Sequence, residues 1–87
     1  MFELGSVVAT PCAIRVCSLS NINPLILIGR HRSGDWGELG EEDLQANRDA
    51  LAFDGRVFSS YVVGDTKLYV ITEWDRSYTT MMCASDY

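Results

Sequence analysis

The segment 31–37 holds the side chains best suited to acid–base chemistry. His31, Asp35 and Trp36 lie within it, and Gly34 and Gly37 give its backbone freedom to bend. A loop of this composition can hold an imidazole beside a carboxylate, which is the arrangement that general acid–base catalysis needs. The same residues also fit a structural role, in which Trp36 fills the core and Asp35 caps a turn. Both interpretations stay open at this point.

A second group of polar side chains follows the turn 73–76. Arg76, Ser77 and Thr79 lie there, and together with a facing His31 they could bind an anion. Arginine offers a planar fork of donors to such a group, and hydroxyl groups can add further hydrogen bonds. The ordinary alternative is a charged hairpin turn followed by threonines at strand positions.

A third pair, Asp43 and Asn47, is spaced to lie on one face of a helix. An asparagine on an otherwise apolar stripe needs a hydrogen-bond partner, because leaving it unpaired costs about 1–3 kcal/mol. We therefore expect Asn47 to clamp a strand edge or the 34–37 loop. Asp43, Asn47 and Trp36 form the predicted structural set.

The cysteines do not show the spacing of a metal site. We interpret Cys12, Cys17 and Cys83 as free, small, buried apolar residues, and their odd number without a signal peptide favours a reducing cytoplasm. No glycine-rich phosphate loop or nucleophile elbow appears, so we predict neither a cofactor nor a metal. The longest apolar run, 25–28, is far shorter than the roughly 20 residues that cross a membrane.

Acidic residues dominate the middle of the chain. The net charge is −5, the pI is about 4.5, and only Arg48 is basic between Asp35 and Asp54. This charge excludes a free-standing nucleic-acid binder, because phosphate contacts need basic residues. The acids could meet a basic surface on another protein or simply keep a helix face solvated. The predicted partner-binding residues are Asp35, Glu38, Glu41, Glu42, Asp49, Trp74 and Asp75.

These side chains must be positioned by a single α+β domain that spans residues 1–87. Thr10-Pro11 and Asn23-Pro24 are helix-start signals, which predict short helices over Pro11–Leu19 and Pro24–His31. The second of these also fits a buried strand. A third helix is expected over Glu41–Leu51, with Leu44 and Leu51 facing the core.

Strands account for the rest of the chain. The short apolar run Ser6–Ala9 predicts an N-terminal strand. After Gly55, apolar and polar residues alternate with a period of two, which predicts strands over Arg56–Val63, Lys67–Thr72 and Ser77–Cys83. Because turns join them in order, we expect a three- to four-stranded antiparallel meander with helices on one face. Its other face is also apolar, and we expect the N-terminal strand or a partner to cover it.

Several motifs together give the chain a resemblance to a known family. They are Ala9-Thr10-Pro11, Arg30-His31, Gly34-Asp35-Trp36-Gly37, Asp43, Asn47, Ile71-Thr72-Glu73, Asp75-Arg76-Ser77 and Thr79-Thr80. On these motifs the chain resembles a family of short bacterial proteins encoded on plasmids, prophages and integrative elements. Members often carry the label plasmid-related protein or type I restriction subunit M. The second label does not fit, because 87 residues cannot hold a methyltransferase's cofactor domain.

The resemblance implies a mobile-element setting similar to that of anti-CRISPR and anti-restriction proteins, which are often small and acidic. We therefore expect a cytoplasmic inhibitor that binds a host protein complex with a basic surface, and that binds neither nucleic acid nor a membrane. A homodimer is a further option. The alternative is a barnase-like or mRNA-cleaving endoribonuclease in which His31, Arg76 and Thr79 are catalytic, although the net charge of −5 opposes it.

Overall fold

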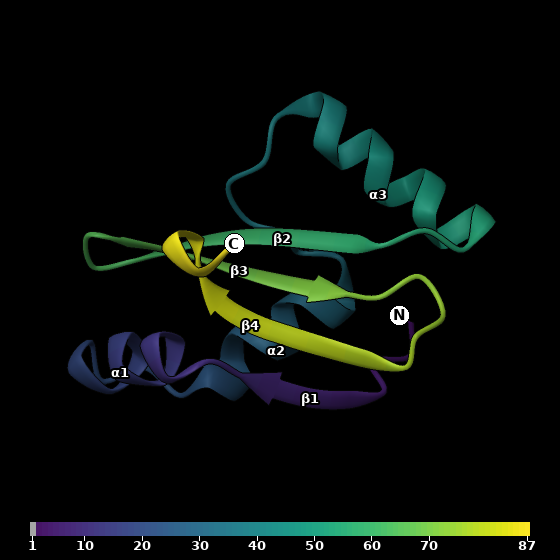
Figure 1. Cartoon of the computed structure of the whole chain (residues 1–87). Helices are drawn as coiled ribbons and strands as arrows, with labels where there is room; N and C mark the ends of the chain where they lie inside the picture. The colour runs from purple at the N-terminus through teal and green to yellow at the C-terminus, as the bar shows by residue number, and fades with distance from the viewer. Residues whose placement is uncertain (1) are drawn as a thin grey trace.

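The computed structural model describes residues 2–87, which form one four-stranded sheet and three α-helices (Figure 1). The strands are β1 (Ser6–Ala9), β2 (Val57–Val63), β3 (Thr66–Thr72) and β4 (Tyr78–Cys83). The helices are α1 (Pro11–Leu19), α2 (Pro24–Ser33) and α3 (Glu41–Phe53), and a 3-10 turn, η1 (Ala84–Asp86), ends the chain. The α+β prediction and the C-terminal meander are confirmed.

The sheet has the order β1-β4-β3-β2 and is mixed. A tight turn at Gly64, where φ is 61°, joins β2 to its antiparallel neighbour β3, and β4 continues the meander. β1 pairs in parallel with β4, with Val7 opposite Thr79. The antiparallel meander is therefore three-stranded, and the four-stranded alternative is excluded because β1 joins the sheet in parallel. The intervening helices carry the chain back to the sheet, and such a crossover permits a parallel pair.

The two N-terminal helices begin where their signals predict. The Thr10 hydroxyl accepts a hydrogen bond from the Ala13 N–H, and the Asn23 side chain accepts one from the Leu25 N–H. Pro24–Ser33 is a helix, so the strand alternative is excluded there. Among residues 2–87 no single helix is long and apolar enough to cross a membrane, whereas α1 and α2 together meet that test, with a 108° bend between them.

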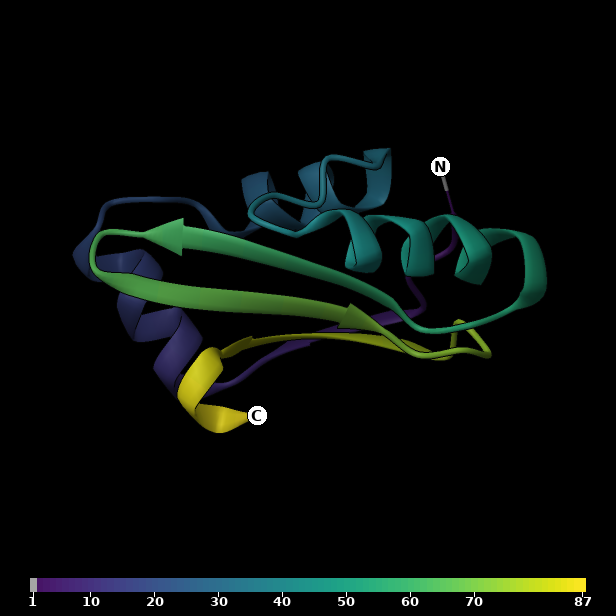
Figure 2. The ribbon, with the colours of Figure 1, turned by 90° about the horizontal axis from the view of Figure 1, so that it is seen from above.

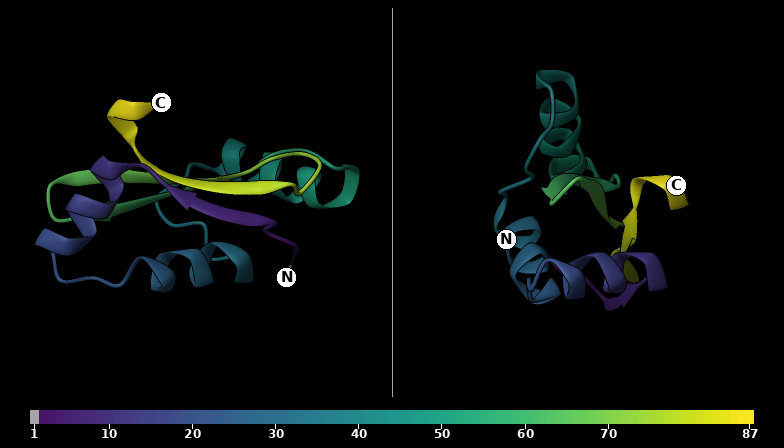
Figure 3. Two further views of the ribbon diagram at one scale, coloured as in Figure 1. Left: turned by 60° about the horizontal axis from the view of Figure 1, so that its bottom comes forward. Right: turned by 90° about the vertical axis from the view of Figure 1, so that its left-hand side faces the viewer.

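Helices α1 and α2 cover one face of the sheet, and η1 lies on the other side (Figures 2 and 3). On that second face Tyr87 packs edge-on against Phe58 and Tyr69, with ring centroids 6.5 and 5.7 Å away. Val62 and Tyr78 remain exposed. The N-terminal strand extends the edge of the sheet and does not cover this face, so that part of the expectation was wrong, while cover by a partner stays a prediction.

The two edges of the sheet differ. At the β2 edge the Asn47 side chain accepts a hydrogen bond from the Phe58 N–H and donates one to its carbonyl, at 2.9 and 2.7 Å. Two residues further along β2, the Ser60 N–H donates to the Trp36 carbonyl and the Ser60 carbonyl accepts from the Glu38 N–H. At the other edge all four residues of β1 are exposed. The homodimer stays a prediction, and β1 is the edge open to it.

Candidate functional site

His31 lies fully buried between α2 and the sheet, with neither ring nitrogen exposed to solvent. Its Nδ1 lies 2.5 Å from the Ser59 hydroxyl, and its Nε2 lies 2.8 Å from the Thr72 hydroxyl. Thr72 continues the chain of contacts to the Thr79 hydroxyl at 2.7 Å, and Thr79 donates to the Leu4 carbonyl at 2.7 Å. Four polar side chains from α2, β2, β3 and β4 therefore form one buried network.

The direction of these hydrogen bonds fixes the form of the imidazole. Because Thr79 gives its proton to a carbonyl, Thr72 must donate to Thr79 and can only accept from His31. His31 therefore carries its proton on Nε2, and Nδ1 accepts from Ser59. Burial favours this neutral form and lowers the pKa of His31 to about 4.

Asp35 does not lie beside His31. Its carboxylate pairs instead with Arg30, whose Nε and Nη2 donate to it at 2.8 and 3.2 Å. This guanidinium lowers the pKa of Asp35 and also stacks over the Tyr61 ring, 4.6 Å from its centroid. The predicted imidazole–carboxylate pair is therefore not formed. The local cause is that Gly34 ends α2 with φ at 96°, and the chain turns Asp35 back toward Arg30.

Arg76 is committed to main-chain carbonyl groups. Its guanidinium donates to the carbonyls of Gly55, Glu73 and Trp74, at 2.6, 3.0 and 3.4 Å, and to that of Ala50 at 3.1 Å. These contacts tie the β3–β4 turn to the C-terminal end of α3. The arginine thus satisfies carbonyls at a helix end, where a positive charge is favourable.

The remaining members of the predicted anion site also have partners inside the fold. Ser77 donates its hydroxyl and its N–H to the Asp75 carboxylate, at 2.7 and 3.1 Å, and these bonds lower the pKa of Asp75. Thr79 is buried in the His31 network. The expectation that Arg76, Ser77 and Thr79 present donors to an external anion is therefore corrected.

Replacing Arg76 by alanine is expected to destabilise the fold by about 2–4 kcal/mol, because hydrogen bonds from a charged donor contribute about 1.5–3 kcal/mol each and cannot all be replaced by water. Arg76→Lys should recover less than half of this loss, since an ammonium group cannot span carbonyls from two segments as a guanidinium does. Urea unfolding monitored by circular dichroism measures both variants. Equal stability of Arg76→Ala and wild type would contradict this structural role.

The predicted structural set is confirmed in two of its three members. Trp36 is 7% exposed in a small cluster with Ala50 and Val57, and Asn47 clamps the β2 edge as expected. Asp43 is exposed in the first turn of α3, and the hydrogen bonds of residues 2–87 do not include its side chain. Its contribution is a favourable charge at the helix N-terminus.

Helix α3 stands at the β2 edge and is mostly exposed (Figure 3, right). Of its 13 residues only Asn47 and Ala50 are buried, with Leu44 half-buried. Leu51, expected in the core, is 43% exposed, and Phe53 is 82% exposed. At this end of the helix Ala50 packs against Gly55, where an added side chain would come within 3.1 Å of the Ala50 Cβ, and Ala50 is buried in place of Leu51.

Most of the predicted partner-binding residues surround this helix. We name the acidic edge as the exposed residues Asp35, Glu38, Glu41, Glu42 and Asp49, together with Trp74 and Asp75. Glu41 is paired with Arg48 at 2.9 Å, whereas Glu42, Asp43 and Asp49 are exposed α3 acids without a basic partner in residues 2–87. Of these three, Glu42 and Asp49 line the same side of the helix, seven residues apart. An open groove of about 350 Å³ includes Asp49 and Phe53.

The turn that carries Trp74 and Asp75 adjoins the C-terminal end of α3. Arg76 joins the two segments through Ala50 and Gly55, and Trp74 is 61% exposed. Exposed tryptophans are enriched at protein-binding surfaces, where they often supply much of the binding energy. No protein family, curated protein or solved structure matches this chain. The geometry and charge of residues 2–87 therefore carry the functional proposal.

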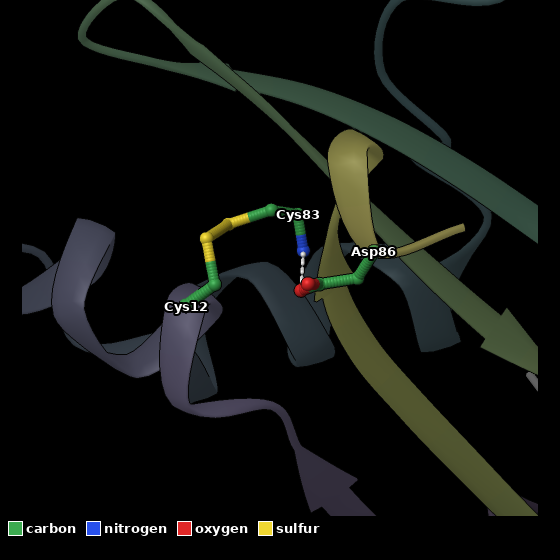
Figure 4. Close-up of side chains that lie close together, drawn as sticks. All are labelled: Cys12, Cys83 and Asp86. Carbon is green, nitrogen blue, oxygen red and sulfur yellow. Dashed lines mark hydrogen bonds between the residues drawn. A yellow bond between two sulfur atoms is a disulfide. The ribbon is translucent and has the colours of Figure 1, made fainter.

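The cysteines require a correction. Cys12 and Cys83 form a disulfide, with Cα atoms 6.0 Å apart, although 71 residues separate them in the sequence (Figure 4). Only Cys17 is free and buried as expected, and burial raises the pKa of its thiol. The parallel pairing of β1 with β4 brings the first turn of α1 to the end of β4, and this pairing is not readable from cysteine spacing.

Proposed function

We propose that this chain is a cytoplasmic, non-enzymatic binding protein. Its acidic edge occupies a basic, nucleic-acid-binding surface of a host defence complex of the CRISPR or restriction type. The exposure of α3 is the observation that carries the proposal: the helix is held by Leu44, Asn47 and Ala50, and its acids point to solvent. Because few of its side chains pack in the core, most of the surface of α3 is available to bind a partner.

The chemistry of the other polar residues supports binding over catalysis. The Nε2 proton of His31 lies within a buried chain of hydrogen bonds, and the guanidinium of Arg76 donates to main-chain carbonyls. An endoribonuclease would need these two groups at a substrate phosphate. The resemblance to plasmid and prophage proteins supplies the setting, in which inhibition of host defence is a common activity.

Reversing the charge of Glu42 and Asp49 is expected to weaken binding to the partner by about tenfold or more at low salt, because opposite charges accelerate association. The difference should shrink at high salt, where exposed charges are screened. The measurement is capture from nuclease-treated lysate of the bacterium that carries the gene, followed by mass spectrometry and titration of the recovered complex against each variant.

The matched control is the double variant Glu3→Lys, Asp65→Lys. It changes the net charge by the same amount at two exposed residues outside the acidic edge. The proposal requires that Glu42→Lys, Asp49→Lys lose the partner while the control keeps it. Equal weakening by both double variants would show that only net charge matters, and that the acidic edge is not the binding surface.

A further inference from the structure

Three groups that can bind a metal ion converge where α1 begins and β4 ends. The sulfur atoms of Cys12 and Cys83 and a carboxylate oxygen of Asp86 all lie within 4.8 Å of one another. Figure 4 shows the Asp86 side chain directed from η1 toward the N–H of Cys83, beside the bond between the two sulfur atoms. The three residues come from α1, β4 and η1, so the fold and not local sequence brings them together.

The carboxylate of Asp86 is already oriented. Its Oδ2 accepts a hydrogen bond from the Thr10 hydroxyl at 2.8 Å and another from the Cys83 N–H at 3.1 Å. Among residues 2–87 no hydrogen bond reaches the other oxygen, Oδ1, which leaves it available to a cation. Hydrogen bonds from a second layer of residues fix metal-binding carboxylates in this way in known sites.

The spacing suits a small tetrahedral ion once the sulfur atoms are no longer bonded. Zinc–sulfur bonds of about 2.3 Å place two thiolates roughly 3.8 Å apart around Zn²⁺, and carboxylate oxygens bind it at about 2.0–2.2 Å. The Cα separation of 6.0 Å lets the two side chains reach one ion with small rotations. Cys83 is buried, Cys12 half-buried and Asp86 exposed, so an ion can enter from one side and keep a water as its fourth ligand.

We propose that reduction of the Cys12–Cys83 disulfide creates a Zn²⁺ site formed by Cys12, Cys83 and Asp86. A dithiol reductant supplies two electrons and two protons: the S–S bond breaks, two cysteine thiols form, and the reductant becomes a disulfide. Zinc then binds both sulfurs as thiolates, and two protons pass to solvent. The same two ends of the fold are thus joined by a covalent bond under oxidising conditions and by a metal ion under reducing conditions.

Cobalt is the probe, because thiolate-bound Co²⁺ is coloured. The untagged chain of residues 1–87, reduced with a phosphine, is expected to bind one equivalent of Co²⁺. The complex should show a sulfur-to-metal charge-transfer band in the near ultraviolet and visible bands typical of tetrahedral coordination. The oxidised chain should show neither. Zn²⁺ should remove both bands by displacing the cobalt. A reduced chain that binds no cobalt, or binds it without the charge-transfer band, would overturn the proposal.

Variants assign the ligands. Cys12→Ser and Cys83→Ser should each lose about half or more of the charge-transfer intensity. Loss of a residue that only hydrogen-bonds a metal ligand typically weakens metal binding by about 10- to 100-fold. Asp86→Asn removes a ligand itself, so it should weaken cobalt binding by at least as much. Asp86→Asn keeps both cysteines, so it tests the site even where a serine variant fails to fold. Cys17→Ser is the matched control, and binding that depends on Cys17, or that persists without Cys12 and Cys83, would contradict the assignment.

Discussion

Replacing Trp36 by alanine is expected to lower the free energy of unfolding by about 3–5 kcal/mol, the usual cost of removing a large buried aromatic side chain. Trp36 joins the β2 edge to α3, since its ring packs with Ala50 and Val57 and its carbonyl accepts from Ser60. For a domain of 87 residues this loss is a large fraction of the total stability, which is typically about 5–15 kcal/mol. Chemical denaturation measured by tryptophan fluorescence and circular dichroism gives the value.

The chain offers a matched control in its second tryptophan. Trp74 is 61% exposed, so Trp74→Ala should change stability by no more than about 0.5 kcal/mol while weakening partner binding. Trp36→Phe should cost less than Trp36→Ala, because the buried Trp36 Nε1 has no hydrogen-bond partner within residues 2–87 to lose. A Trp36→Ala variant that melts like wild type would show that this side chain does not hold the β2 edge.

Lowering the pH should destabilise the protein through His31. The pKa of His31 is about 4 in the folded state and about 6.5 in an unfolded chain, so the unfolded state binds the extra proton first. The contribution of the neutral imidazole to the free energy of unfolding is therefore fully present above pH 6.5. It declines as the pH falls below 6.5, and the loss is complete once the pH has fallen through 4. The loss amounts to about 3 kcal/mol, from 1.36 kcal/mol for each pKa unit.

This effect can be isolated because the chain contains a single histidine. The imidazole resonances in NMR should titrate near pH 4, and His31→Gln should flatten the dependence of unfolding free energy on pH between 6.5 and 4. Asp35 and Asp75 lose their stabilising charge only at lower pH, since the pKa of each is below its ordinary value. Titration of His31 near 6.5 would contradict the closed hydrogen-bond network.

Local signals explain what the sequence predicted correctly. Thr10-Pro11 and Asn23-Pro24 start helices because each capping side chain satisfies a free N–H, and this depends on a few neighbouring residues only. The turn residue Gly64 and the alternation of apolar and polar residues on either side of it likewise predicted the meander. Asn47 was identified as a clamp because an amide on an apolar stripe must find a partner.

Long-range pairing explains what the sequence did not reveal. Nothing near Ser6–Ala9 indicates that this strand pairs in parallel with β4, and the Cys12–Cys83 pair depends on that arrangement. One interpretation of the sequence gave His31 an acid partner, whereas its partners in the structure are hydroxyl groups on two distant strands. The sequence did contain a signal for these partners. Ser59 and Thr72 stand at strand positions whose side chains face the core, and a buried hydroxyl group needs a polar partner.

The most direct test of the proposed function is displacement of nucleic acid from the captured partner complex. A fluorescent nucleic acid bound to that complex reports release as a fall in anisotropy when this protein is added. We expect wild type and the Glu3→Lys, Asp65→Lys control to release the nucleic acid completely, and Glu42→Lys, Asp49→Lys to release it about tenfold less effectively at low salt. A stable complex that holds the protein and the nucleic acid together would contradict the claim that the acidic edge occupies the nucleic-acid-binding surface.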